Sequence, residues 1–329
     1  MFRSSFNRPN LSYKVQFGGK SQDAKIKEIA QMISDRHSIP LGNSRTAKCG
    51  IIYCTAKLTA ENVAEKLNSE LDTILGPSRS RRVKPYHAGF TKEEREAIQQ
   101  DWTAGNVPIV VATIAFGMGI NKPDVRFVVH FNMPKSLEGY LQESGRAGRD
   151  GQPAECVIYY NWNDVIKLKK MLQDEEKREE AIERGATSEQ FDIQQAHSLE
   201  SLHAMAAFCQ EPHRCRREMM LEYFNEKFER SECKNTCDNC QKLDGLQLKY
   251  VDQTESAKTV IQILEYLAKK QEASKSNEAS LGTVRSIFYG DKEVEGKYDS
   301  SIIGIGKVFK FPKKEMERLI RTMITEVSS

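Results

Sequence analysis

The chain has 329 residues, of which 39% are hydrophobic and 29% charged, an ordinary composition for a globular protein with room for two or three domains. It contains no run of 18 apolar residues, so we expect no membrane span, and its first residues lack the apolar core of a secretory signal peptide. We therefore expect a cytosolic or nuclear protein whose eight cysteines do not form a disulfide framework.

Charge is unevenly distributed along the chain. Residues 1–150 carry 22 lysines and arginines against 15 acidic residues, whereas residues 151–329 carry 27 against 31. A basic first half fits a surface that faces phosphate groups, and a solvated surface with a chance asymmetry explains the same numbers equally well.

Two predicted helices have clear capping signals. Ser21 is expected to cap a helix that ends near Arg36, and a capping box formed by Thr91 and Glu94 opens another helix that stops at Gly105. The run Gly-Gly-Lys-Ser just before the first of these helices lacks the earlier glycine of a phosphate loop, and no buried strand is expected before it. We interpret that run as an ordinary loop.

Buried strands are predicted between the helices. Residues 50–54 form one, followed by a helix capped near Thr59, and residues 109–112 and 127–131 form two more, joined by a glycine-containing loop. Strands that alternate with helices indicate a parallel sheet.

A helix is expected after the strand at 127–131, with its C-terminal end carrying the sequence Gly-Arg-Ala-Gly-Arg at 145–149. Two arginines three residues apart, among small neighbours, can both contact one anionic group, because a guanidinium makes bidentate bonds to phosphate. A surface pair of arginines in salt bridges is the alternative.

The runs ATIAFGMGI, KPDVRFVVH and QESGRAGRDG, with YHAG at 86–89, resemble motifs of superfamily-2 helicases and, in detail, of the Bloom-type branch of the RecQ DNA helicases. The resemblance extends from Ser5 to about Cys240. It implies an α/β fold: a second RecA-like parallel-sheet lobe at 1–160, a helical zinc-binding domain at 161–245 and a partial winged helix at 246–329.

The resemblance also implies roles for individual residues. Arg149 would be the arginine finger and Arg146 a second contact to the γ-phosphate or to the opposite lobe. Nucleotide-side contacts are expected from Gln142, Asn121 and Gly119, and DNA contacts from Thr113, His87 and Lys122. Asn121 stands where the family more often has aspartate, and a structural histidine is the alternative for His87.

Four cysteines have the spacing C-x17-C-x3-C-x2-C, namely Cys215, Cys233, Cys237 and Cys240. Two close thiolates on a tight turn, joined by a second pair, can form a closed tetrahedral zinc site, and four cysteine ligands leave no open position for catalysis. The pattern resembles the RecQ zinc-binding region, so structural Zn²⁺ is expected, with free thiols or a redox role as the alternative.

The 329 residues contain no G-x-x-x-x-G-K-[ST] phosphate loop. ATP and Mg²⁺ are therefore expected only together with a first RecA-like lobe, which a partner chain could supply, and we expect little ATPase activity from this chain alone.

Three hypotheses follow. In the first, the chain is part of an ATP-dependent 3′→5′ DNA helicase of RecQ type in the nucleus. That helicase would act in DNA repair, recombination and replication on single-stranded, duplex and branched DNA. In the second, the chain is a non-catalytic, zinc-stabilised module that binds DNA or has a regulatory role. The third, a zinc-dependent hydrolase, needs an open metal position and a nearby carboxylate base, which the sequence does not offer.

Overall fold

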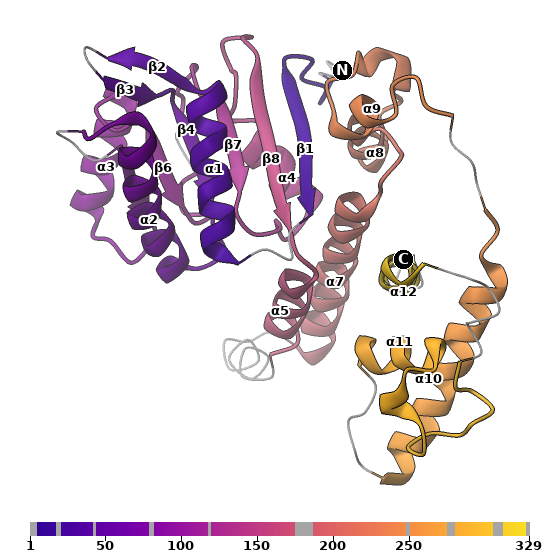
Figure 1. Cartoon of the computed structure of the whole chain (residues 1–329). Coiled ribbons are helices and arrows are strands. Elements are labelled where there is room, and N and C mark those ends of the chain that lie inside the picture. The colour runs from indigo at the N-terminus through magenta and orange to yellow at the C-terminus, as the bar shows by residue number, and fades with distance from the viewer. Residues whose placement is uncertain are drawn as a thin grey trace. The chain divides into compact units, whose positions relative to one another are not determined.

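The computed structural model describes residues 5–17, 21–41, 44–78, 82–117, 120–174, 187–247, 251–274, 280–304 and 312–326. The chain divides into two compact units, residues 1–245 and residues 246–329 (Figure 1). Each unit is described by itself. Within the described residues, no helix is both long enough and apolar enough to cross a membrane.

The first unit is built on a parallel sheet of six strands in the order β1-β8-β7-β4-β6-β5. Its strands are β1 (Leu11–Phe17), β4 (Gly50–Tyr53), β5 (Val83–Tyr86), β6 (Ile109–Ala112), β7 (Phe127–His130) and β8 (Ala154–Tyr160). A separate antiparallel pair consists of β2 (Ser38–Leu41) and β3 (Ser44–Ala47). The predicted α/β class with a parallel sheet is confirmed.

Alternate residues of each strand face opposite sides of the sheet, so each side has its own apolar core. In β4, Ile51 packs in one core and Ile52 in the other. Helices α1 (Gln22–Arg36) and α2 (Lys57–Leu75) cover the side of Ile52, and α3 (Lys92–Ala104) and α4 (Leu137–Ser144) cover the side of Ile51 (Figure 1).

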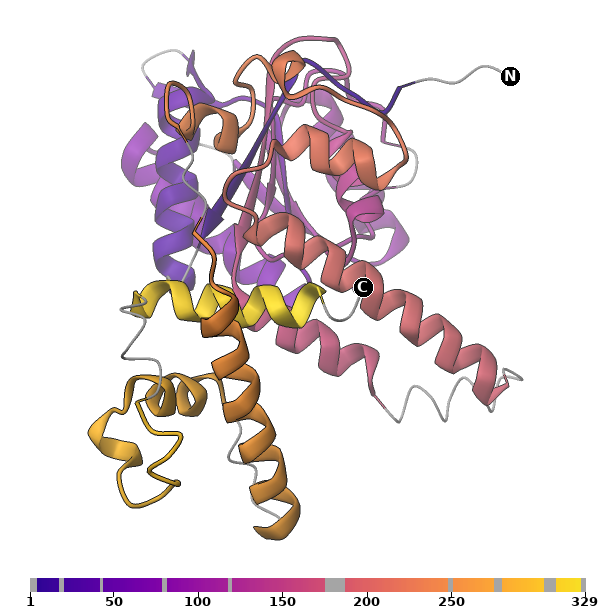
Figure 2. The same cartoon turned by 90° about the vertical axis from the view of Figure 1, so that its right-hand side faces the viewer.

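The rest of the first unit is mainly helical in the residues that the structure describes. It consists of α5 (Trp162–Leu172), α7 (Ser188–Gln210), α8 (Arg216–Tyr223), the short 3-10 helix η1 (Arg230–Cys233) and α9 (Asp238–Lys242). Helices α5 and α7 lie side by side (Figure 2). Buried residues of α7 and α8 join the core on the α4 side of the sheet, so this helical part and the sheet share one core.

The second unit contains α10 (Thr254–Ser274), α11 (Leu281–Tyr289), the 3-10 helix η2 (Lys292–Val294) and α12 (Lys313–Glu326). Its separate core includes Ile263, Phe288 and Met316, all at most 1% exposed. The amphipathic pattern of residues 256–269 and the sequence of residues 313–325 predict two helices, which are present as α10 and α12, whereas α11 was not predicted. The sequence ASKSNEAS at 273–280 is typical of a linker, and most of it lies outside the described residues, as does the segment 305–311. The partial winged helix stays a prediction.

Two of the three predicted N-caps are confirmed. Ser21 accepts a hydrogen bond from the backbone N–H of Ala24 at the start of α1, and Thr91 and Glu94 form the reciprocal capping box of α3. Gly105 ends α3 with a left-handed backbone, φ +83°. Each of these side chains accepts a hydrogen bond from a backbone N–H group at the start of its own helix, which is why local sequence is informative there.

Four predictions about helix and strand bounds were wrong. Helix α2 begins at Lys57 rather than near Thr59. The sequence of residues 161–184 predicts one long helix, whereas α5 ends at Leu172. Strand β1 does precede the Gly-Gly-Lys-Ser run, whose residues 18–20 lie outside the described part. The arginine sequence 145–149 lies in turns after α4 and not in the helix, because α4 ends at Ser144.

Candidate functional site

The two motif arginines lie in the turns at 145–151, which we call the arginine turn. Arg146 donates from Nη1 to the carbonyl of Gly117, and Arg149 donates from Nη1 to the carbonyl of Ile120 at 2.8 Å. Arg149 also donates to Asn121 Oδ1 at 3.2 Å. Both guanidinium groups therefore bind the same segment, the loop of residues 113–126 that joins β6 to β7. Arg146 is 6% exposed, whereas Arg149 lies at the surface.

Glycines make these close approaches possible. A Cβ atom at Gly117 would lie 2.9 Å from Arg146 Nη2, and one at Gly148 would lie 2.5 Å from Asn10 Nδ2. Gly148 also has a φ of +55°, which side chains disfavour. Arg8 donates to the carbonyl of Gly148 at 2.6 Å and to two further carbonyls of the arginine turn. The turn is thus held by the β6–β7 loop and by the residues just before β1.

A buried group of three side chains adjoins Arg146. Tyr53 donates to the carbonyl of Phe116 at 3.0 Å and stacks on His130, with ring centroids 5.3 Å apart. His130 Nε2 lies 2.7 Å from Glu143 Oε2. Burial raises the pKa of Tyr53, and the nearby charge of Arg146 offsets only part of that rise, so the phenol stays neutral. Sequence reasoning did not single out these residues; the position of Tyr53 and His130 at strand ends was the available signal.

Two predicted DNA contacts follow the carboxyl ends of strands, where open α/β sheets bind ligands. Thr113 follows β6, is half-buried and donates its backbone N–H to the carbonyl of Tyr86 at 3.2 Å. His87 follows β5 and is 3% exposed. Its Nδ1 accepts from the N–H of Gly89 at 3.2 Å, so Nε2 carries the proton that faces Glu61 Oε1 at 2.8 Å.

The other predicted contacts are more dispersed. Lys122 is only 9% exposed; its Nζ donates to the carbonyl of Thr103 at 3.0 Å and lies 3.2 Å from Asp124 Oδ1. Gln142 is an exposed residue of α4, and Gly119 lies outside the described residues. The structure therefore brings Asn121 and Arg149 into contact, while Lys122 already has partners within the protein.

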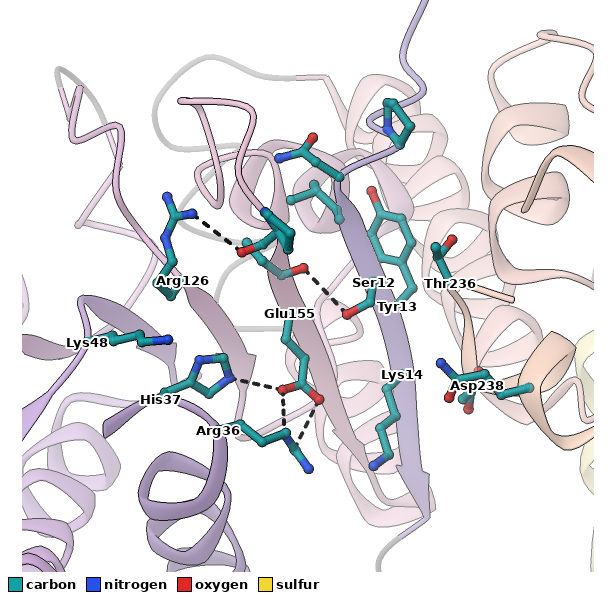
Figure 3. Close-up of a pocket in the computed structure, with 16 residues that line it drawn as sticks. Ser12, Tyr13, Lys14, Arg36, His37, Lys48, Arg126, Glu155, Thr236 and Asp238 are labelled. Carbon is teal, nitrogen blue, oxygen red and sulfur yellow. Dashed lines mark hydrogen bonds and ion pairs between the residues drawn. The ribbon is translucent and has the colours of Figure 1, made fainter. Parts of the chain in front are cut away.

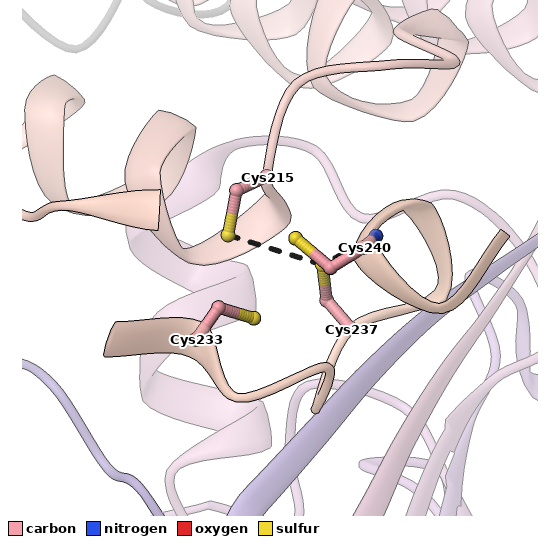
Figure 4. A group of neighbouring side chains, drawn as sticks. All are labelled: Cys215, Cys233, Cys237 and Cys240. Atoms are coloured by element: carbon pink, nitrogen blue, oxygen red, sulfur yellow. Dashed lines mark hydrogen bonds between the residues drawn. The ribbon is translucent and has the colours of Figure 1, made fainter. Parts of the chain in front are cut away.

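The four predicted metal ligands form one buried cluster (Figure 4). Their Sγ atoms all lie within 4.8 Å of one another, and those of Cys215 and Cys237 are 3.9 Å apart. Tetrahedral zinc with Zn–S bonds of about 2.3 Å places its sulfurs about 3.8 Å apart, so the donor set and spacing fit this ion.

Tight backbone geometry gathers the cysteines. Cys215 and Cys237 occupy the N-cap positions of α8 and α9, and Cys237 Sγ accepts from the backbone N–H of Cys240 at 3.4 Å. Between η1 and α9, Lys234 and Asn235 have left-handed backbones, with φ of 49° and 56°. Such strain is sustained only where the surroundings fix the turn, as a metal-ligand knuckle would.

The cysteine cluster is joined to the sheet through β1. Tyr13 pairs with Cys237 in an isolated parallel bridge, and Asp238 accepts from the N–H of Val15 at 3.1 Å. Asp238 also binds Arg216, with Nε 3.0 Å from Oδ1. The side chains of this ion pair are 3% and 0% exposed. Burial raises the pKa of Asp238, but the charge and hydrogen bond of Arg216 outweigh this and hold the pKa below its ordinary value.

The sequence matches two family models. Residues 24–151 match the helicase conserved C-terminal domain, and residues 162–241 match the RecQ zinc-binding family. The first match contains the arginine turn and the β6–β7 loop, and the second contains all four clustered cysteines.

Curated relatives extend the similarity along most of the chain. The ATP-dependent DNA helicase hus2/rqh1 of Schizosaccharomyces pombe is 35% identical over 98% of this chain and 21% of that protein. The putative ATP-dependent DNA helicase Q1 of Caenorhabditis elegans is 37% identical over 80% of this chain and 37% of its own length. The ATP-dependent helicase SGS1 of Saccharomyces cerevisiae is 32% identical over 98% of this chain and 20% of its own length. The chain thus spans about a fifth to a third of these relatives.

Proposed function

This chain belongs to the RecQ family of helicases, and we propose that it works as part of an ATP-dependent DNA helicase that moves 3′→5′. Its contribution would be an arginine finger, contacts to the tracked DNA strand and a zinc-stabilised extension of the lobe. The names of the relatives describe ATP-dependent DNA helicases; for this chain the activity, its direction and its place in repair, recombination and replication in the nucleus are proposals.

The observation that carries the proposal is the arrangement of Arg146 and Arg149 on one loop. Arg149 is exposed and close to Asn121, so its guanidinium can exchange a loop carbonyl for a phosphate oxygen with a change of rotamer. Arg146 is buried and bonded to Gly117, which suits a residue that holds the loop in position. An arginine that reaches a transferring phosphoryl group stabilises its charge and contributes roughly 10³–10⁵ in rate.

Such a finger acts only on a nucleotide that another set of groups already holds. A first RecA-like lobe with a phosphate loop would bind ATP and Mg²⁺, which supply the transferable phosphoryl group and neutralise its charge. From this chain, Gln142 lies exposed on α4 and could relay nucleotide contacts to that lobe, and the Asn121 amide could bond a ribose hydroxyl.

The proposed DNA contacts lie at the carboxyl edge of the sheet. Thr113 would donate its hydroxyl to a backbone phosphate, and the His87 ring, positioned by Glu61 and stacked on Phe90, would line the same edge. Lys122 would have to leave its partners Thr103 and Asp124 to contact DNA, so we expect its effect to be smaller than that of Thr113. Most of this binding would be to phosphates and therefore sensitive to salt.

We propose Zn²⁺ as the ion for the cysteine cluster. Four sulfur ligands close a tetrahedral shell, so the ion would organise the fold rather than activate water. This favours the structural role over a zinc-dependent hydrolase, which needs an open metal position.

The test is a fusion in which a phosphate-loop lobe from a relative is joined to the N-terminus of this chain. We expect DNA-stimulated ATP hydrolysis and unwinding of a duplex with a 3′ single-stranded tail, and little ATPase from the chain alone. Arg149→Ala should lower kcat of the fusion by about 10³ with little change in DNA affinity, since the finger acts on transition-state charge.

Arg95→Ala, which removes a half-buried arginine of α3 outside the arginine turn, serves as the control and should leave kcat unchanged. A fusion that binds DNA but hydrolyses no ATP would favour the alternative of a non-catalytic, zinc-stabilised DNA-binding module. ATPase that is indifferent to Arg149→Ala would show that the arginine finger is misassigned.

A further inference from the structure

A cavity of about 610 Å³ lies at the β1–β8 edge of the sheet, between the end of α1 and the start of α9 (Figure 3). Ser12 and Lys14 alternate along β1 with Leu11, Tyr13 and Val15, which belong to the core on the α4 side. Their side chains therefore project on the opposite side of the sheet from the arginine turn. None of the proposed nucleotide or DNA contacts lines this cavity.

Basic side chains predominate in the lining. They are Lys14, Arg36, Lys48 and Arg126, with His37 beside them, whereas the acidic residues are Glu155 and Asp238. Figure 3 shows Glu155 in the middle of the cavity, with Lys48 on one side and Lys14 on the other.

Both acidic groups are already engaged within the protein. Glu155 accepts two bonds of 3.1 Å from Arg36 and lies 3.0 Å from His37 Nε2. Burial alone would raise the pKa of Glu155, but the bond to His37 and the charge of Arg36 lower it, so the carboxylate is ionised. Asp238 is committed to Arg216 and to the backbone of β1.

Among the described residues, two ammonium groups of the cavity make no hydrogen bond or close ion pair, although the charge of Lys14 already acts on Glu155. In the described part of the chain, neither Lys14 nor Lys48 has a hydrogen-bond or ion-pair partner for its Nζ. Arg126, by contrast, makes bonds of 2.6 and 2.7 Å to the Asp150 carboxylate. The net positive charge of the cavity is therefore carried by the two lysines, which stand on either side of a carboxylate.

We propose that this cavity binds the phosphodiester backbone of nucleic acid, as a contact separate from the one proposed at the carboxyl ends of the strands. The inference rests on the proposed function. A single small anion between the lysines would be repelled by Glu155, whereas successive phosphates of one strand can reach Lys14 and Lys48 while passing the carboxylate. Lysines bind phosphate as point charges without requiring a fixed orientation, which suits contacts that do not depend on base sequence.

The experiment measures binding of the zinc-loaded chain to fluorescent single-stranded and duplex DNA by anisotropy, over a series of NaCl concentrations. The double variant Lys14→Gln/Lys48→Gln should bind roughly tenfold more weakly at low salt, with the slope of log K against log salt reduced by about 2. The matched control is Lys27→Gln/Lys227→Gln, which removes the same charge from exposed lysines outside the cavity and should change affinity less than twofold.

Glu155→Gln provides a test of opposite sign. Removing this carboxylate leaves Arg36 and His37 without their shared partner and raises the positive potential of the cavity, so DNA binding should tighten several-fold and depend more steeply on salt. Circular dichroism confirms that each variant is folded. Weaker DNA binding by the lysine double variant, together with tighter DNA binding by Glu155→Gln, would show that DNA binds at this cavity.

Equal DNA affinities of the lysine double variant and its control would overturn the assignment of the cavity as a DNA contact. In that case, DNA-stimulated ATPase activity of the fusion described above would still support the proposed function. Absence of DNA binding by the unsubstituted chain would also overturn it. If the lysine substitutions weaken binding of poly-glutamate as much as binding of DNA, the cavity is a site for acidic peptides and the nucleic-acid assignment is wrong.

Discussion

The buried ion pair between Arg216 and Asp238 allows a quantitative test of how the cysteine cluster is attached to the sheet. The substitution Asp238→Asn keeps an oxygen that can accept from the N–H of Val15 but leaves the Arg216 guanidinium without its counter-charge. Arg216 is 0% exposed, so water cannot screen the remaining charge.

Breaking a buried ion pair by removing one partner costs about 3–5 kcal/mol of unfolding free energy. We expect the lower end, about 3 kcal/mol, because Arg216 retains bonds to the carbonyl of Phe208 and to Asn239 Oδ1. At an m-value of about 3 kcal/mol/M, the urea midpoint of the first unit should fall by about 1 M.

The assay follows from the positions of the only two tryptophans, Trp102 and Trp162, which both belong to the first unit. Their fluorescence during urea unfolding, at saturating zinc, therefore reports on that unit without a contribution from residues 246–329. Asp23→Asn, which breaks the exposed pair with Lys66, is the matched control and should shift the midpoint much less.

Two outcomes would contradict this reasoning. The double variant Arg216→Met/Asp238→Asn removes both charges and should be more stable than Asp238→Asn alone, since no unpaired charge stays buried. The stability difference between the unsubstituted chain and Asp238→Asn should also shrink at low pH. A carboxylate whose folded-state pKa is depressed contributes its stability above the ordinary value of 3.8 and loses it as pH falls through the lower folded-state pKa. A difference that is constant with pH, or a double variant less stable than the single one, would show that the pair does not act electrostatically.

Two further predictions concern the metal and the arginine turn. Chelation should release one Zn²⁺ per chain, measured with a colorimetric indicator, and shift the tryptophan transition to lower urea, whereas an unchanged transition would separate the cluster from the folding of the sheet. Gly148→Ala should lower unfolding free energy by about 2 kcal/mol because the new Cβ meets Asn10 in a left-handed backbone. Gly151→Ala, also at positive φ but with nothing within 4 Å, should cost only about 1 kcal/mol, and equal losses would exclude the steric explanation.

Helices and central strands were predictable because their signals are local. Ser21, Thr91 and Glu94 satisfy free backbone groups within their own helices, and the apolar runs of β4, β6 and β7 reflect burial on both sides of a parallel sheet. Strand β1 was missed because its polar residues Ser12 and Lys14 line a cavity rather than a core. Its pairing partner β8 lies more than 140 residues away, and no local pattern indicates such a pairing.

In the candidate site, too, features with a local sequence signal were predictable and features that depend on distant residues were not. Cysteine spacing was sufficient to predict the cluster, since a metal site requires a fixed set of ligands in one place. The turn conformation of residues 145–151 was not predictable, because it depends on Arg8 and Asn10, which are far away in sequence. The contacts among Tyr53, His130 and Glu143 likewise depend on which strand ends are neighbours in the sheet.

Strand β1 connects the two functional regions of the first unit. On one side, Arg217 donates to the carbonyls of Arg8 and Leu11, and Cys237 bridges to Tyr13, so the cysteine-bearing segment fixes the path of the chain entering β1. On the other side, the Arg8 guanidinium binds three carbonyls of the arginine turn. Contacts of β1 and of the residues just before it therefore extend from the clustered cysteines to the backbone of the arginine turn. Strand β1 is the edge strand of the sheet, and its outer edge is met by residues 236–238, through the bonds of Tyr13 to Thr236 and of Val15 to Asp238.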